Sequence, residues 1–170
     1  MAASVQKWFP FSLEPAVEQV VRQVDFSWCL GDPVVAELPG EAPFWIVRRE
    51  RLDQLLTDQA KQAGAECCAG VTVTDIGRDS DHWSVTAADG QRWRTRSVVI
   101  ADGSASPWPQ RLGLGAKRVQ TATTMSVRLE GQGRLKNGTT RFEFGLVKQG
   151  FAWAFPVAGG VNIGVGSFIG

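Results

Sequence analysis

Apolar and polar positions repeat with two different periods along the chain. Residues 49–64 carry apolar side chains at helical spacing, and Gly64 supplies a C-terminal stop, so an amphipathic helix is predicted there. Its apolar positions are Leu52, Leu55, Leu56, Ala60 and Ala63. From residue 121 onward the period changes to two, with glycine and asparagine at the turns, which predicts an antiparallel sheet. The strands expected in it are 121–131, 139–147, 150–160 and 161–170.

Local signals predict the elements that precede this helix. Residues 12–24 begin with Ser12 as an N-cap and carry Pro15 near the first turn, which predicts a short helix. Strands are predicted at 25–30, 33–38 and 42–48, with a turn at 31–33 between the first two.

The segment after the helix is predicted to contain a meander and a buried strand. Residues 65–79 read as a strand region in which valine and threonine alternate at 71–74, and residues 82–96 read as a hairpin with its tight turn at Asp89-Gly90. Residues 97–102, with the sequence SVVIAD, form the most continuous apolar run of this part of the chain. Such runs suit a strand that is buried on both faces, as in a parallel sheet covered by helices.

These elements predict an α+β fold with two kinds of part. We expect an antiparallel sheet and a second module made of the helix, the three-strand meander and the buried strand. Residues 1–47 are expected to form the first part of the sheet, residues 48–118 the module, and residues 119–170 the second part of the sheet.

Composition narrows the class of protein. The 18 Lys and Arg nearly balance the 17 Asp and Glu, so no nucleic-acid partner is indicated. Seven Trp and nine Phe without any Tyr indicate an apolar core or pocket. The three cysteines and one histidine have no zinc-binding spacing, and no metal site is predicted. Without an apolar signal peptide or membrane span, a cytoplasmic location is expected.

The end of the predicted buried strand is a candidate ligand-binding edge. Ligands of open α/β sheets bind beyond the carboxyl ends of the strands, where Asp102 is expected. Gly103 can adopt positive φ and allows a ligand to approach the backbone. The alternative is a simple turn in which Asp102 caps the next segment.

Two motifs resemble those of FAD-dependent oxidoreductases of the aromatic-hydroxylase type. Residues Arg49, Leu52, Asp53 and Leu56 match the family pattern R-x-x-(L/F)-D-x-x-L. Residues Ala101, Asp102, Gly103 and Ser106 match the later pattern (A/G)-D-G-x-x-S. The resemblance implies that Arg49 contacts FAD and that Asp102 and Gly103 lie near the FAD pyrophosphate. It also implies that residues 48–118 are a partial FAD-binding module, and that residues 1–47 and 119–170 form the two parts of an antiparallel substrate-binding sheet. The family usually has an arginine three residues after the serine, whereas here Arg111 comes later.

A third motif resembles the Y-x-W-x-F-P signature of geranylgeranyl reductases. Trp153, Phe155 and Pro156 match it, and Phe151 replaces the tyrosine, which removes a hydroxyl group. The resemblance implies that Phe151, Trp153, Phe155 and Pro156 line the cavity for a prenyl chain. The alternative is that these aromatic side chains only face the protein core.

The chain has no G-x-G-x-x-G fingerprint, so it resembles an internal segment of a longer flavoprotein. We expect the intact protein to use FAD, with NAD(P)H as electron donor, to reduce double bonds of prenyl chains, and the isolated chain to be inactive; no catalytic residue is assigned. Two alternatives stay open: a flavin monooxygenase or halogenase for aromatic substrates, and a non-catalytic lipid- or protein-binding module. We expect the protein to bind a prenyl-lipid substrate and to contact a membrane peripherally. We also expect it to form a homodimer through exposed strand edges.

Overall fold

The computed structural model describes residues 1–41, 43–115, 120–131, 135–136 and 138–169. The chain divides into two compact units, one formed by Met1–Ala65 with Gln120–Gly170 and the other by Glu66–Val119. The predicted α+β class is confirmed, because the structure is mostly sheet with few helices. The predicted division at residues 47 and 118 concerns binding roles, and it stays a prediction.

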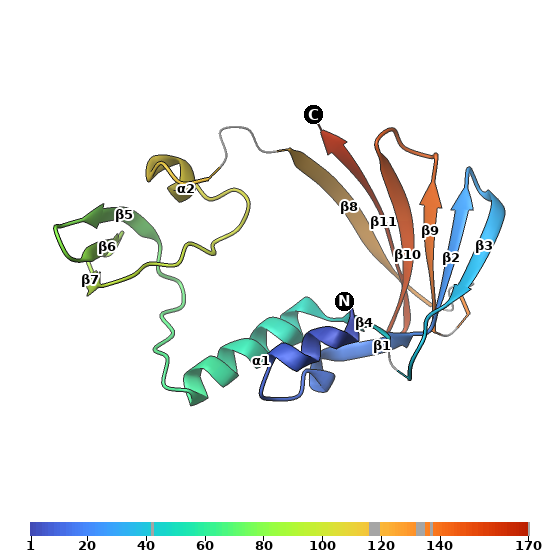
Figure 1. Cartoon of the computed structure of the whole chain (residues 1–170), viewed down its shortest axis with the longest axis horizontal. Helices are drawn as coiled ribbons and strands as arrows, with labels where there is room; N and C mark the ends of the chain where they lie inside the picture. Colours follow the sequence, from blue (N-terminus) through green and yellow to red (C-terminus); the bar gives the residue numbers. More distant parts are fainter. Residues whose placement is uncertain (42, 116–119, 132–134, 137, 170) are drawn as a thin grey trace. The chain divides into compact units, whose positions relative to one another are not determined.

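A six-stranded sheet dominates the first unit (Figure 1). Its strands, in spatial order, are β3 (Gly31–Glu37), β2 (Gln23–Trp28), β9 (Thr139–Phe144), β10 (Gly150–Val157), β11 (Gly160–Ile169) and β8 (Thr121–Glu130). Neighbours are antiparallel except β2 and β9, which pair in parallel. The β2–β9 pair joins strands from the two ends of the chain, so residues on both sides of the second unit build one sheet.

Smaller elements accompany this sheet in the first unit. They are η1 (Ala3–Trp8), η2 (Glu14–Ala16), β1 (Val17–Val21), β4 (Phe44–Val47) and α1 (Arg49–Gln62). Strands β1 and β4 pair with each other in an antiparallel ribbon. Val21, Ile46 and Val157 are buried together, so the ribbon and β10 share a small apolar core.

The helix over 49–64 is confirmed as α1, whereas the helix over 12–24 is wrong. Only Glu14–Ala16 form a helical turn, and the residues that follow form β1 and β2. Ser12 does accept a hydrogen bond from the Glu14 backbone N–H, but the helical turn that begins there ends at Ala16. The β-branched valines at 17, 20, 21 and 24 instead favour strands, and β1 finds its partner in β4. The turn expected at 31–33 lies at Cys29-Leu30, where both residues have positive φ.

The second unit contains β5 (Val73–Arg78), β6 (Trp83–Ala87), β7 (Arg92–Thr95) and the short helix α2 (Trp108–Arg111). The three strands form the predicted meander, and Gly90 takes positive φ in the hairpin turn. The buried strand predicted at 97–102 is wrong: these residues have no regular secondary structure, and Val99 is 87% exposed. A strand buried on both faces needs paired neighbours and covering elements, and no described strand pairs with this run.

Among the described residues, no helix combines the length and the apolar character needed to span a membrane.

Candidate functional site

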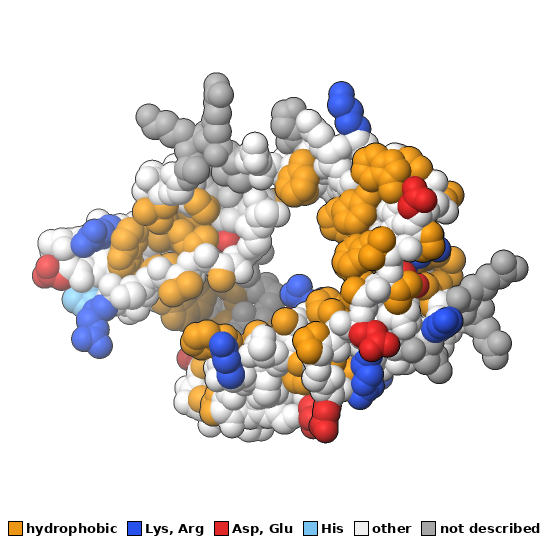
Figure 2. Space-filling view, turned by 45° about the vertical axis from the view of Figure 1, so that its right-hand side comes forward, with side chains coloured by type: hydrophobic (Ala, Val, Ile, Leu, Met, Phe, Trp, Pro, Cys, Tyr) orange, Lys and Arg blue, Asp and Glu red, His pale blue; other side chains and the backbone are white. Residues whose placement is uncertain are grey.

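Six aromatic side chains of β2, β9 and β10 lie together on one face of the six-stranded sheet. We call them the aromatic wall: Phe26, Phe142, Phe144, Phe151, Trp153 and Phe155. Their neighbouring ring centroids are 5.5 to 6.4 Å apart, which is the distance at which aromatic pairs attract. In Figure 2, apolar side chains follow the sheet on the right-hand side of the view.

Sheet register explains how the aromatic wall assembles. Phe142 lies opposite Phe26 on β2 and opposite Trp153 on β10, and Phe144 lies opposite Phe151. Because side chains of adjacent strands in register point to the same face, alternating aromatic residues on three strands produce one continuous surface.

Trp153 is held by the strand beside it, β11. Its indole N–H donates to Oδ1 of Asn162 at 3.2 Å, and its ring lies over Gly164 and Gly166. A Cβ at residue 164 would overlap with the indole ring, so glycine is what permits this ring position. The two glycines form the floor beside the aromatic wall.

The structure brings together three of the four residues predicted to bind substrate. Phe151, Trp153 and Phe155 contact one another in the aromatic wall. Pro156 is buried and, by strand alternation, belongs to the opposite face. Sequence reasoning missed Phe26, Phe142 and Phe144, although the period-two aromatic pairs in DFSW and RFEF could have suggested them.

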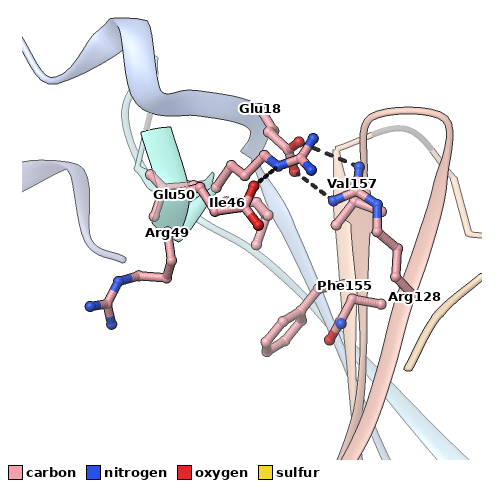
Figure 3. A pocket seen from close by; sticks show the side chains of 10 residues that line it. Glu18, Ile46, Arg49, Glu50, Arg128, Phe155 and Val157 are labelled. Atoms are coloured by element: carbon pink, nitrogen blue, oxygen red, sulfur yellow. Dashed lines mark hydrogen bonds and ion pairs between the residues drawn. The ribbon is translucent and has the colours of Figure 1, made fainter. Parts of the chain in front are cut away.

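A cavity of about 370 Å³ lies beside the end of the aromatic wall (Figure 3). Its polar lining comes from β1, β8, β11 and the start of α1, and its apolar lining comes from β4 and β10. The lining includes Glu18, Ile46, Arg49, Arg128, Phe155 and Asn162. Phe155 belongs both to the aromatic wall and to the cavity, so the two surfaces are continuous.

An ion pair crosses one side of this cavity. The guanidinium of Arg128 faces the carboxylate of Glu18, with two N···O distances of 3.4 Å (Figure 3). It also donates to the carbonyl oxygen of Ala158 at 2.8 Å. The Glu18 side chain is only 2% exposed, whereas Arg128 is 36% exposed. The pair thus presents the arginine, rather than the glutamate, to incoming molecules.

The predicted FAD-contacting residues lie in different units of the chain. Arg49 is the first residue of α1, lines the cavity and pairs with Asp53 at 3.2 Å, and its side chain is 78% exposed. Asp102 and Gly103 are exposed in the second unit, and Gly103 has φ of 101° with nothing near its missing Cβ. These features leave a cation and an open backbone accessible to a ligand, while their role in FAD binding stays a prediction.

The opposite face of the sheet holds a buried carboxylate, Glu143. It accepts hydrogen bonds from the Ser27 hydroxyl, from the Leu30 backbone N–H at 2.7 Å and from Arg141 at 3.1 Å. These donors, Ser27 first, lower the pKa of Glu143 below its ordinary value. Because Leu30 lies in the β2–β3 turn, this cluster fixes that turn against β9 and has a structural role.

No cluster of three or more His, Cys, Asp or Glu that could hold a metal ion occurs among the residues the structure describes.

No protein-family model matches the sequence. The menaquinone reductase of Mycobacterium tuberculosis is 32% identical over 133 residues, which are 71% of this chain and 32% of that protein. The digeranylgeranylglycerophospholipid reductase of Methanococcus vannielii is 24% identical over 75% of this chain and 34% of that protein. The ubiquinone hydroxylase UbiL of Rhodospirillum rubrum is 33% identical over 56% of this chain and 23% of that protein. By their names, these relatives are oxidoreductases: two reductases and a hydroxylase.

Solved structures agree with this assignment at the level of the fold. The halogenase PltM, in a complex with phloroglucinol and FAD, superimposes with a TM-score of 0.70 over 90% of this chain and 36% of that one, at 15% identity. The flavin-dependent halogenase CmlS gives a TM-score of 0.61 over 92% of this chain and 30% of that one, at 23% identity. The predicted resemblance to FAD-dependent proteins is confirmed, and the chain spans about one third of the length of its curated relatives.

Proposed function

We propose that this chain supplies the substrate-binding sheet and part of the FAD-binding site of an oxidoreductase that reduces double bonds of prenyl chains. The observation that carries the proposal is the aromatic wall, an apolar surface of six rings that continues into a cavity. A prenyl chain is long and apolar, and burying it against such a surface contributes about 0.8 kcal/mol per CH₂ group.

The relatives support this substrate class by what their names state. One is a reductase of menaquinone and another a reductase of digeranylgeranylglycerophospholipid. In this proposal Phe151, Trp153 and Phe155 contact the prenyl chain directly, and Pro156 acts from the opposite face by shaping β10. The aromatic wall orients the prenyl chain and excludes water from it.

The residues present fit accessory contacts to FAD. Arg49 carries an accessible guanidinium that can exchange its exposed partner Asp53 for a phosphate oxygen. Asp102 and Gly103 offer a carboxylate for a hydroxyl group and a backbone that a ligand can approach closely. FAD, when bound, supplies hydride transfer, and NAD(P)H is the proposed donor. The sequence has no G-x-G-x-x-G turn, so we expect this chain alone to show no turnover.

The substrate class also suggests where the protein works. A prenyl lipid is stored in membranes, so we propose a cytoplasmic protein that contacts a membrane surface peripherally. A homodimer through strand edges is proposed as well, because β3 and β8 each have a neighbour on one side only among the described strands.

A second candidate function is hydroxylation of an aromatic substrate, which the similarity to the ubiquinone hydroxylase favours. Stacked rings such as Trp153 and Phe155 can hold a flat aromatic ring as well as a chain. The two candidates differ in the ligand that this sheet prefers.

The test is a titration of the chain with geranylgeraniol, followed by tryptophan fluorescence. We expect a saturable change that Phe142→Ala weakens, since this variant opens the aromatic wall and keeps Trp153 as reporter. The matched control Trp83→Phe, in the second unit, should leave the titration unchanged. Binding of phloroglucinol without any binding of geranylgeraniol would replace the prenyl proposal by the aromatic one.

A further inference from the structure

We propose that Arg128 and Asn162 bind an uncharged carbonyl oxygen at the end of the aromatic wall. The ligand is then an apolar chain with a carbonyl-bearing head. This inference rests on the proposed function of the aromatic wall and adds a polar subsite to it. Register places the two residues in one row across the sheet, since Arg128 lies opposite Asn162 and Asn162 lies opposite Phe155. All three line the cavity.

The hydrogen bond from Trp153 fixes the orientation of the Asn162 amide. An indole nitrogen can only donate, so the oxygen of the amide must face it. The NH₂ end of Asn162 therefore points away from Trp153, and it has no partner among the described residues. Because Asn162 lines the cavity, this end supplies hydrogen-bond donors there.

Arg128 keeps further donors beyond those it already uses. An arginine has five N–H donors, and three of them point to Glu18 and to the carbonyl of Ala158. The remaining two, one on Nε and one on Nη1, have no acceptor among the described residues. Arg128 and Asn162 thus offer only donors to a ligand, which selects an acceptor such as a carbonyl oxygen.

Charge pairing argues against an anionic head group at Arg128. Three arginines line the cavity, and each is paired with a carboxylate: Arg48 with Glu50, Arg49 with Asp53 and Arg128 with Glu18. A phosphate that took Arg128 would leave the carboxylate of Glu18 buried without its partner, which is strongly unfavourable. An uncharged oxygen can accept the spare donors and leave the pair intact.

The size and the apolar lining of the cavity suit a small head group. Its volume of about 370 Å³ falls at the lower end of small-molecule sites. Ile46 and Val157 pack beneath Phe155, so apolar contacts surround the polar row. A prenyl chain that follows the aromatic wall past Phe155 would bring its carbonyl head group to Arg128 and Asn162.

The test compares ligands that share one chain and differ in the head. The probes are geranylgeranylacetone, which has a ketone, the hydrocarbon with CH₂ in place of its C=O group, and geranylgeranyl phosphate. Wild-type protein should bind the ketone about tenfold more tightly than the hydrocarbon, as expected for one charge-assisted hydrogen bond. It should also bind the ketone more tightly than the phosphate.

Two variants identify the residues responsible. Asn162→Asp keeps an acceptor for Trp153 and removes the NH₂ donors, while Arg128→Lys keeps a cation beside Glu18 and removes the guanidinium donors. Each should reduce the ketone preference to about twofold, with hydrocarbon affinity unchanged. Circular dichroism checks that both variants fold.

Every outcome of this comparison either supports the carbonyl subsite or overturns it. Equal affinity for ketone and hydrocarbon, a ketone preference that survives in both variants, or tighter binding of the phosphate would overturn the subsite and leave the prenyl-binding wall intact. Failure of all three probes to bind would remove the proposed function and the subsite together.

Discussion

The indole ring of Trp153 occupies the space where a side chain of residue 164 would be. Trp153 and Gly164 lie opposite each other on β10 and β11, and a Cβ at position 164 would overlap with the ring and lie 2.9 Å from the carbonyl oxygen of Met125. The position of the largest side chain in the aromatic wall therefore depends on the absence of a side chain beside it. This relationship makes Gly164 part of the candidate site although it carries no functional group.

Gly164→Ala is predicted to destabilise the protein by about 2–3 kcal/mol, because neither the indole ring nor the β8 backbone can move aside easily. Urea unfolding followed by circular dichroism measures this loss. The matched control is Gly166→Ala, whose added Cβ would meet Thr124 at 3.1 Å and the Trp153 ring at 3.4 Å. It should cost less than about 1 kcal/mol. Equal stabilities of the two variants would show that the ring of Trp153 is not fixed over Gly164.

Local patterns predicted much of the fold. The apolar stripe and Gly64 predicted α1, and period-two alternation predicted β8 to β11, because in both cases neighbours in sequence supply the periodicity. The predicted helix at 12–24 failed because its cap signals are local, whereas β1 is decided by a distant partner strand, β4. The apolar run at 97–102 failed for the converse reason: no described strand pairs with it.

The candidate site could be predicted only in part. The motif that contains Trp153 and Phe155 lies within one strand, so its spacing was visible in the sequence. Phe26 joins Phe142 only through the parallel pairing of β2 with β9, and Arg128 meets Glu18 across 110 positions of the chain. Such register between distant segments depends on the packing of the whole sheet, and no local pattern encodes it.

The buried carboxylate of Glu143 is predicted to make stability depend on pH. Its pKa is lower in the folded protein than in the unfolded chain, because Ser27, Leu30 and Arg141 donate to its charged form. The stabilisation is therefore complete above the ordinary pKa of about 4.5 and is lost as the pH falls through the lower folded value.

Glu143→Gln tests this assignment, since it keeps the shape of the side chain and removes its charge. Thermal melts between pH 3 and pH 7 should show the variant less stable than wild type at neutral pH, with the difference narrowing in acid. A gap that stays constant down to the lowest pH would mean that the charge of Glu143 contributes nothing.

Arg49→Ala is predicted to weaken FAD binding while leaving the free energy of unfolding nearly unchanged. The pair of Arg49 with Asp53 is exposed at both ends, so its loss should change the free energy of unfolding by less than about 0.5 kcal/mol. If Arg49 contacts FAD, the same variant should weaken FAD binding about tenfold, measured by quenching of flavin fluorescence. Arg51→Ala removes a neighbouring exposed arginine of α1 and serves as control. The same FAD affinity in both variants would remove Arg49 from the cofactor site.

The edge strand β8 is predicted to mediate self-association. It pairs with β11 on one side, has no described neighbour on the other, and exposes Met125 at 76% and Val127 at 53%. Unpaired backbone groups and exposed apolar side chains together favour pairing with a second copy of the strand.

Light scattering coupled to size exclusion should detect a dimer. The double variant Met125→Lys/Val127→Lys should shift it to monomer, because charged side chains on an edge oppose such pairing. Val99→Lys places a charge at a still more exposed valine outside any strand and should leave the dimer intact. A wild-type protein that stays monomeric at high concentration would show that β8 is an edge without a partner.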